Sequence, residues 1–515
     1  MTTSTLQSRL EKTLATSQLS GAAGSTLFDA YLDHSRIGFE ANVIPLLFQS
    51  TQHLRNRFEA VGQQLTALEP YDQLRCRLIF ASSFRRLGLT VSPTDGKSSS
   101  TQVLESAQQL ADTAGIWRIP THQNFTNLLL LYTLVANGDL TSPEADHYLS
   151  AACSQFRHIF VLGDDDLVKP VSSSRGWGAY TLAISDLSAA LERRTAPYLS
   201  DREFSLFTRN REPYYLPAPD SLRRFIPHAL SKLVDQCIHP MTYYLRLART
   251  LAIHFSLEVD QQDDNRLLSA FDEMDAYRVW WQGCMTVLRS QPMSVVFRAT
   301  AESAITLNYV LGLMLEFSTR DYLSSKLEKL SLDLSRGGMQ SVNLPAAPPI
   351  VSSLLAISES RCARALALFL RQTRKRNGFY LLVASVGCLC SVNQFNALAA
   401  TLCESSPNNY ELFPLGPLDK LASVTFLAKT LENAQGIYPS ANLGASIANL
   451  KSVQRSLEIE STYSGEMALI LVVSISSDQH VPDSTFQRHL PDTPSAMLVL
   501  ATELIARGGD PHVTL

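Results

Sequence analysis

The 515-residue sequence lacks the features that most often reveal a protein's chemistry directly. It contains no catalytic motif, and none of its eight cysteines belongs to a Cys-x-x-Cys pair. Closely spaced cysteine pairs are typical of structural zinc sites and of redox centres. The sequence therefore predicts reduced, buried, intracellular thiols, and it predicts neither a disulfide framework nor a metal site.

Charge and long apolar runs are also scarce. Charged residues make up 18% of the chain and the net charge is −4, whereas nucleic-acid-binding domains usually carry a basic excess. The longest apolar runs, 379–390 and 467–473, are too short to span a bilayer. The first twenty residues contain no apolar segment of the kind found in secretory signals. We therefore expect a soluble protein that neither enters a membrane nor, as a whole, binds DNA.

What the sequence does contain is apolar residues at helical spacing. Hydrophobic residues make up 45% of the chain, and over most long segments they recur every three or four residues. This periodicity predicts an all-α fold, a large multi-helix bundle of antiparallel helices. Residues 467–475 are rich in β-branched side chains and fit either a short strand or a buried helix.

The clearest helix boundaries lie between residues 102 and 158. Gly115 is expected to end a first helix, and Thr121 to cap the start of a second. Ser142 is expected to cap a third helix that has Pro143 at its first position. The connection between the second and third helices is short, which predicts that they pack as an antiparallel pair.

Composition divides the chain into four parts. Residues 1–24 are polar and are expected to be flexible. Residues 25–336 hold the main helical domain, and 337–349, with two glycines and three prolines, form the best linker. Residues 350–515 are expected to be a C-terminal helical region that packs on the main domain.

Three segments of the main domain carry a family resemblance. Residues 107–139 have a helix ending in an Arg-x-Pro-Thr turn, followed by a leucine-rich helix that ends near a glycine. Residues 144–159 have a Tyr-Leu pair followed by spaced alanines, and residues 175–207 combine a tryptophan, an aspartate, an Arg-Pro turn and a Ser-Asp pair. Together they resemble the fungal-specific transcription factor domain, the middle homology region of fungal zinc-cluster transcription factors. The resemblance covers residues 27–330.

The third segment supplies the family-motif positions, which this resemblance places at Trp177, Asp186, Arg194, Pro197, Ser200 and Asp201. The chain departs from the family at several points. The double tryptophan is reduced to Trp177 and Tyr180, two residues separate Arg194 from Pro197, and Arg193 holds the family's glycine position. The run from Ser200 to Glu203 also predicts a capping box at the start of a short helix.

The resemblance implies a transcription regulator of RNA polymerase II genes, located in the nucleus and not an enzyme. Its partners would be other transcription proteins, a small-molecule effector and a second copy of the chain. Family members normally carry an N-terminal zinc cluster of six cysteines, a spacing this sequence lacks. Zinc and DNA contact would belong to that module, and no catalytic, cofactor-binding or metal-binding residue is predicted within this chain.

Two alternatives remain open. A DNA-binding-deficient relative would act as a co-regulator by protein contact. A terpenoid-synthase-like helical enzyme would use acidic runs such as 164–166 and 260–264 to hold metal ions. The first run lacks an acid four residues on, and no second ligand set accompanies the other run.

Three further features each fit two interpretations. Asp186 either pairs with an arginine inside the bundle or faces solvent. The segment from Arg194 to Asp201 forms either an effector- or partner-sensitive helix junction or a simple turn and cap. Trp280 and Trp281 serve either core packing or a ligand site.

Overall fold

The computed structural model describes residues 24–31, 45–86, 99–136, 142–161, 174–208, 230–257, 264–290, 295–335, 347–373 and 444–459, with isolated positions at 216–219 and 421–432. Every regular element in these residues is a helix, so the predicted all-α fold is confirmed. Residues 467–475, the expected flexible segment up to residue 23 and most of the expected linker lie outside the described residues. The last three linker residues belong to a helix that begins at Ala347.

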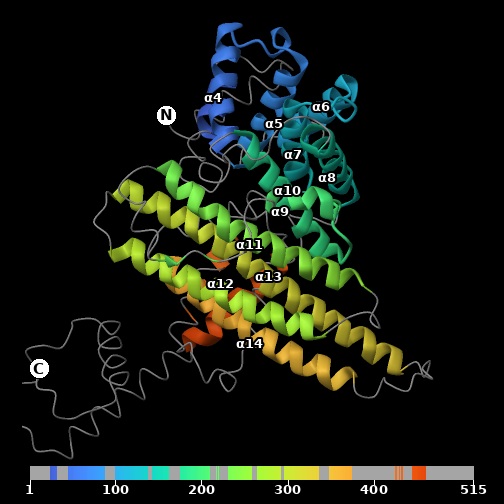
Figure 1. Cartoon of the computed structure of the whole chain (residues 1–515). Helices are drawn as coiled ribbons and strands as arrows, with labels where there is room; N and C mark the ends of the chain where they lie inside the picture. The colour runs from blue at the N-terminus through green and yellow to red at the C-terminus, as the bar shows by residue number, and fades with distance from the viewer. Residues whose placement is uncertain are drawn as a thin grey trace, which may run out of the picture.

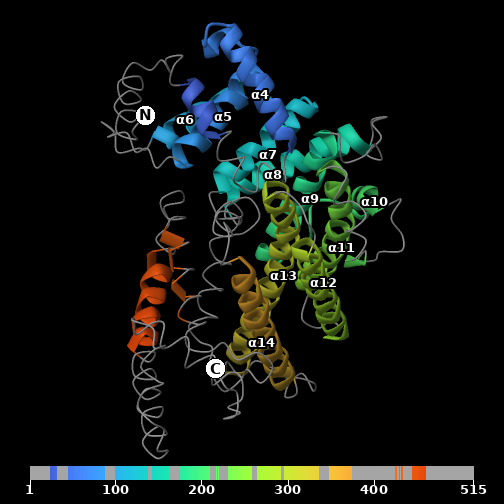
Figure 2. The ribbon, with the colours of Figure 1, turned by 90° about the vertical axis from the view of Figure 1, so that its left-hand side faces the viewer.

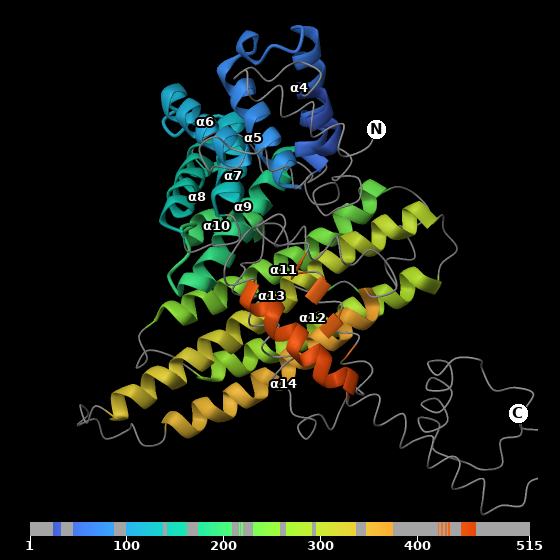
Figure 3. The same ribbon diagram turned by 180° about the vertical axis from the view of Figure 1, so that it is seen from behind.

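The main helices are α4 (Pro45–Ala60), α5 (Pro70–Arg86), α6 (Ser99–Ala114), α7 (His122–Ala136), α8 (Pro143–Phe156), α9 (Ser174–Arg193), α10 (Asp201–Thr208), α11 (Leu230–Ser256), α12 (Asp264–Ser290), α13 (Val295–Ser335) and α14 (Ala347–Thr373). A 3-10 turn, Leu65–Ala67, precedes α5, and a π-helical turn, Arg157–Val161, follows α8. A further helix covers residues 444–459 and lies behind the long helices in the view of Figure 1, as Figure 3 shows from the other side.

These helices form two groups, which Figures 1 and 2 show one above the other. The N-terminal group contains α4 to α8, and the long-helix group contains α11 to α14. Helix α13 is central in the second group, because it packs against α11, α12 and α14. Helix α9 lies between the groups and contacts α4 and α8 on one side and α11 on the other.

The N-terminal group has its predicted helix ends and a core of aromatic rings. Gly115 adopts a positive φ of 62°, and the amide of Ile116 bonds back to the carbonyl of Ala111, which ends α6 in a Schellman motif. The Oγ1 atom of Thr121 accepts the amide of Asn124 at 3.1 Å, so this predicted cap is confirmed. The prediction for Ser142 was wrong in part: it occupies the N-cap position, but its side chain makes no capping hydrogen bond.

Apolar burial explains the amphipathic pattern of these helices. Phe28, Phe58 and Phe80 pack with ring centroids 5.3 to 6.0 Å apart. The apolar face of α8, formed by Tyr148, Leu149, Ala152, Cys153 and Phe156, is buried and continues into the π-helical turn at Ile159. Burial of such faces is the main stabilising contribution to a helical domain, at roughly 25 cal/mol per Å² of apolar surface. The buried apolar side chains of both groups belong to one hydrophobic core, and α9 lies where the two groups meet.

Candidate functional site

The family-motif positions converge at the end of α9. Asp186 lies in α9, Arg194 and Pro197 lie in the turn that follows it, and Ser200 and Asp201 lie at the start of α10. Trp177 lies in the first turns of α9, but its side chain is outside the described part of the chain. We call the segment from residue 193 to residue 203 the α9–α10 junction.

Helix α9 ends on a residue in the left-handed conformation. Arg194 has a φ of 56°, and the amide of Thr195 donates to the carbonyl of Ala190 at 3.1 Å. Glycine usually fills this position because a side chain is strained there. The resemblance placed the family's glycine position at Arg193, whereas the backbone requires positive φ one residue later.

The side chain of Arg194 extends to the long-helix group. One terminal nitrogen donates to Ser325 Oγ at 2.5 Å and the other to the carbonyl of Asp321 at 3.3 Å, both on α13. These bonds offset part of the backbone strain. They also attach the end of α9 to the central helix of the other group.

Asp186 holds the turn in place from inside the protein. Its side chain is 0% exposed, and its two oxygens accept the amides of Tyr198 and Leu199, each at 2.9 Å. The solvent-facing interpretation of Asp186 was therefore wrong, and the hydrogen-bond donors are backbone amides and not an arginine side chain. Burial raises the pKa of Asp186 to about 6, although the two amide bonds oppose that rise.

The predicted capping box is confirmed at the start of α10. The amide of Ser200 donates to Glu203 Oε2 at 2.6 Å, and the amide of Glu203 donates to Ser200 Oγ at 3.4 Å. Glu203 is buried and also forms an ion pair with Arg157 in the π-helical turn after α8. Burial alone would raise the pKa of Glu203. The hydrogen bonds from Arg157 and Ser200 together lower it by more than burial raises it, so the pKa lies below the ordinary value.

Arg249 of α11 joins the junction to the long helices and was missed at the sequence level. Its Nη1 donates to the carbonyl of Leu199 at 2.7 Å, and its Nε and Nη2 donate to Asp201 Oδ1 at 3.2 and 2.8 Å. The guanidinium also lies 4.9 Å from the ring centroid of Phe204. Nothing in the local sequence marks Arg249, because its partners lie 45 to 50 positions earlier in the chain.

Tyr198 adds a contact to the N-terminal group. Its hydroxyl donates to Asp146 Oδ2 on α8 at 2.6 Å. Arg193 pairs with the same carboxylate and lies 5.2 Å from the Tyr198 ring centroid. The junction therefore contacts α8, α11 and α13 at once, through the side chains of different junction residues.

The chemistry of the junction is that of a structural link. The thiol of Cys153 in α8 is buried, and burial raises its pKa well above the ordinary range, which keeps it protonated. Within the described ranges, no group of three or more His, Cys, Asp or Glu residues could hold a metal ion. Residues 164–166 and 260–263, the acidic runs of the enzyme alternative, lie outside those ranges.

The tryptophan pair of α12 lies in the core. Trp280 and Trp281 are buried, and Trp281 stacks on Tyr309 with 3.9 Å between ring centroids, which is core packing. Of the helices that the structure describes, none has the length and apolar character needed to cross a membrane.

Comparison with known proteins gave no assignment: no family model matches the sequence, and no curated protein or solved structure matches it. The resemblance to the fungal transcription factor domain therefore depends on the motif residues themselves.

Proposed function

We propose that this chain is the regulatory domain of a fungal zinc-cluster-type transcription regulator that acts in the nucleus on RNA polymerase II genes. One observation carries the proposal. The motif positions whose side chains are described, Asp186, Arg194, Pro197, Ser200 and Asp201, lie in or against one hydrogen-bonded junction.

The junction suits a regulatory role because its links are numerous but individually weak. Partly exposed ion pairs and hydrogen bonds contribute about 0.2–1 kcal/mol each, and Arg194, Arg249 and Arg157 all make contacts of this kind. A small-molecule effector or a partner protein that prefers one packing of the two groups would shift the population toward that packing. Zinc and DNA contact are assigned to the six-cysteine module, and this chain performs no catalysis.

A tethering experiment tests this function. The chain is fused to an unrelated DNA-binding domain upstream of a reporter gene in yeast, and its output is compared with that of the DNA-binding domain alone. We expect the fusion to change reporter output and Arg249→Gln to alter that change, because it disconnects α11 from the junction.

The matched control is Arg202→Gln. Arg202 lies beside Asp201 in α10, its side chain is exposed, and it makes no ion pair among the described residues. We expect Arg202→Gln to behave like the unmodified fusion at equal protein level on an immunoblot. A fusion whose output equals that of the DNA-binding domain alone contradicts the proposed function.

A second form of the proposal is a co-regulator that acts by protein contact without binding DNA. The cysteine spacing favours it, because only Cys388 and Cys390 are close together in the printed sequence. Sequencing the gene upstream of Met1 distinguishes the two forms. An in-frame six-cysteine cluster supports the DNA-binding regulator, and its absence supports the co-regulator.

A further inference from the structure

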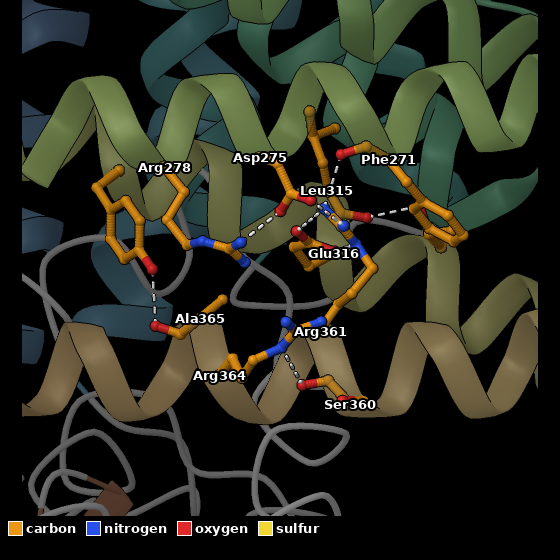
Figure 4. A network of polar contacts seen from close by, with 11 residues as sticks. Phe271, Asp275, Arg278, Leu315, Glu316, Ser360, Arg361, Arg364 and Ala365 are labelled. Carbon is orange, nitrogen blue, oxygen red and sulfur yellow. Dashed lines mark hydrogen bonds and ion pairs between the residues drawn. The ribbon is translucent and has the colours of Figure 1, made fainter. Parts of the chain in front are cut away.

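A partly buried ionic layer lies between α12, α13 and α14, well away from the α9–α10 junction in sequence (Figure 4). At its centre is Arg361 of α14, which is 3% exposed. It donates to both oxygens of Glu316 on α13 at 3.1 and 2.8 Å, to Asp275 on α12 at 2.8 Å and to the carbonyl of Phe271 at 2.9 Å. The hydrogen bonds of Arg361 are thus well satisfied.

The charges of this layer do not balance. Its carboxylates are Asp275 and Glu316, and both are occupied: Glu316 by Arg361, and Asp275 by Arg361 and by Arg278 at 2.5 Å. Arg364, one turn from Arg361, is left with a single bond, a 3.4 Å contact from its Nε to the carbonyl of Ser360 on its own helix. Three guanidinium groups therefore face two carboxylates, and one positive charge has no counter-charge among the described residues.

The electrostatic surroundings of Arg364 agree with this count. Burial and the positive charges of Arg278 and Arg361 lower the pKa of Arg364, and Asp275 and Glu316 only partly oppose them. The neighbouring acids Asp321 and Glu359 lie within ion-pair distance of a different arginine, Arg320. The repulsion between Arg364 and the positive charges of Arg278 and Arg361 therefore arises within the layer.

Helix α12 presents three buried donors on the same stretch. The Nη1 atom of Arg278 and the indole Nε1 atoms of Trp280 and Trp281 are inaccessible to solvent and have no hydrogen-bond partner among the described residues. Trp281 itself is 0% exposed. Buried donors in proteins are nearly always paired, and Arg278 Nη1 is the unpaired donor that belongs to a residue of the ionic layer.

We propose that this layer binds a small oxyanion, the carboxylate or phosphate group of a metabolite, between Arg278 of α12 and Arg364 of α14. Figure 4 shows the two side chains reaching from facing helices into the same layer. Guanidinium groups present paired donors that match the oxygens of carboxylates and phosphates. The side chain of Arg278 is 18% exposed and Arg364 is half-buried, so each side chain has part of its surface at solvent.

The bound anion supplies the charge and the acceptors that the layer lacks. It neutralises the excess positive charge, accepts from Arg278 Nη1, and connects α12 directly to α14. This inference concerns a region outside the junction and does not depend on the proposed function.

Thermal unfolding of the whole chain with inorganic phosphate or with succinate, at constant ionic strength, tests the site. We expect at least one of the two to raise the melting temperature by about 1–2 °C at roughly ten times its dissociation constant. A response to phosphate alone identifies a phosphate site, and a response to succinate alone identifies a carboxylate site. No response to either overturns the proposal.

Arg364→Gln and Arg266→Gln form a matched pair of variants. Arg266 lies on α12, is exposed and is remote from the layer, so Arg266→Gln should retain the full response. Arg364→Gln should melt higher than the unmodified chain without anion, because the repulsion is removed, and should lose the anion response. Arg364→Lys keeps the positive charge but loses the paired donors of the planar guanidinium, so the anion should raise its melting temperature by less. An Arg364→Gln variant that responds like the unmodified chain contradicts the assignment.

Discussion

At the residue scale, Asp186 determines the shape of the junction. Its carboxylate is buried in α9, where two backbone amides, those of Tyr198 and Leu199, replace water as its hydrogen-bond donors. Burial disfavours the charged form and hydrogen bonding favours it, and the net result is a pKa of about 6. The protonated form is thus favoured by folding, which links the stability of the protein to pH.

Asp186→Asn tests this linkage. The folded-state pKa lies above the ordinary value of 3.8, so the stabilising effect of protonation is complete below about pH 4 and is lost as pH rises through 6. The difference between the two pKa values corresponds to at most about 3 kcal/mol. Urea unfolding at a series of pH values should show this loss in the unmodified chain and a flatter profile in Asp186→Asn. The same pH profile in both proteins would contradict the assignment, whatever constant offset the substitution adds.

At the element scale, α10 shows how a short helix is fixed by its first turn. Only eight residues long, it is too short to be stable alone. Its capping box satisfies amides at its start, and Glu203 also reaches Arg157 beyond α8. One side chain therefore serves both a local cap and a contact between helices.

Ser200→Ala and Glu203→Ala should differ in cost. Ser200→Ala removes one long capping bond and should reduce the free energy of unfolding by about 0.5–1 kcal/mol. Glu203→Ala leaves the amide of Ser200 and the guanidinium of Arg157 without their acceptor, and should cost about 1–3 kcal/mol. Denaturant unfolding of the two variants measures the difference. Equal costs would mean that Glu203 acts only as a cap.

Helix boundaries were predictable where the sequence encodes them locally. Gly115, Thr121 and the Ser200–Glu203 capping box act within a few residues, and each has its predicted role. Arg249 was not predictable, because its function in the junction depends on how α11 packs. Arg194 illustrates the same limit, since its positive φ is compensated by contacts to α13, about 130 positions later.

At the scale of the whole molecule, the all-α fold followed from periodicity, but the grouping of the helices did not. Residues 337–349 were predicted to be a linker before a region that packs on the main domain, but the sequence did not show that α14 packs along α13 or that Arg361 bonds into α12 and α13. Amphipathic patterns show that a helix has a buried face, but not which helix covers it. The ionic layer could not be foreseen, because it joins residues up to 90 positions apart.

Replacing Arg361 should be among the most destabilising changes in the chain. Arg361→Ala leaves Glu316 buried, with its pKa already raised by burial and without its partner, and should cost about 3–5 kcal/mol. The double change Arg361→Met with Glu316→Leu removes both charges and should recover most of that loss. Denaturant unfolding of the two proteins measures the recovery. A double variant as unstable as Arg361→Ala would show that packing volume, and not the unpaired charge, dominates.

Helix α13 gives these separate observations a mechanical consequence. It is 41 residues long, which corresponds to a rod of about 60 Å. Glu316 anchors α14 to it, and the carbonyl of Asp321 anchors the end of α9 to it, five residues or about 8 Å further along the same axis. Both contacts lie on one continuous helix, so a rotation or shift of α13 at Glu316 would also move the carbonyl of Asp321 that holds Arg194.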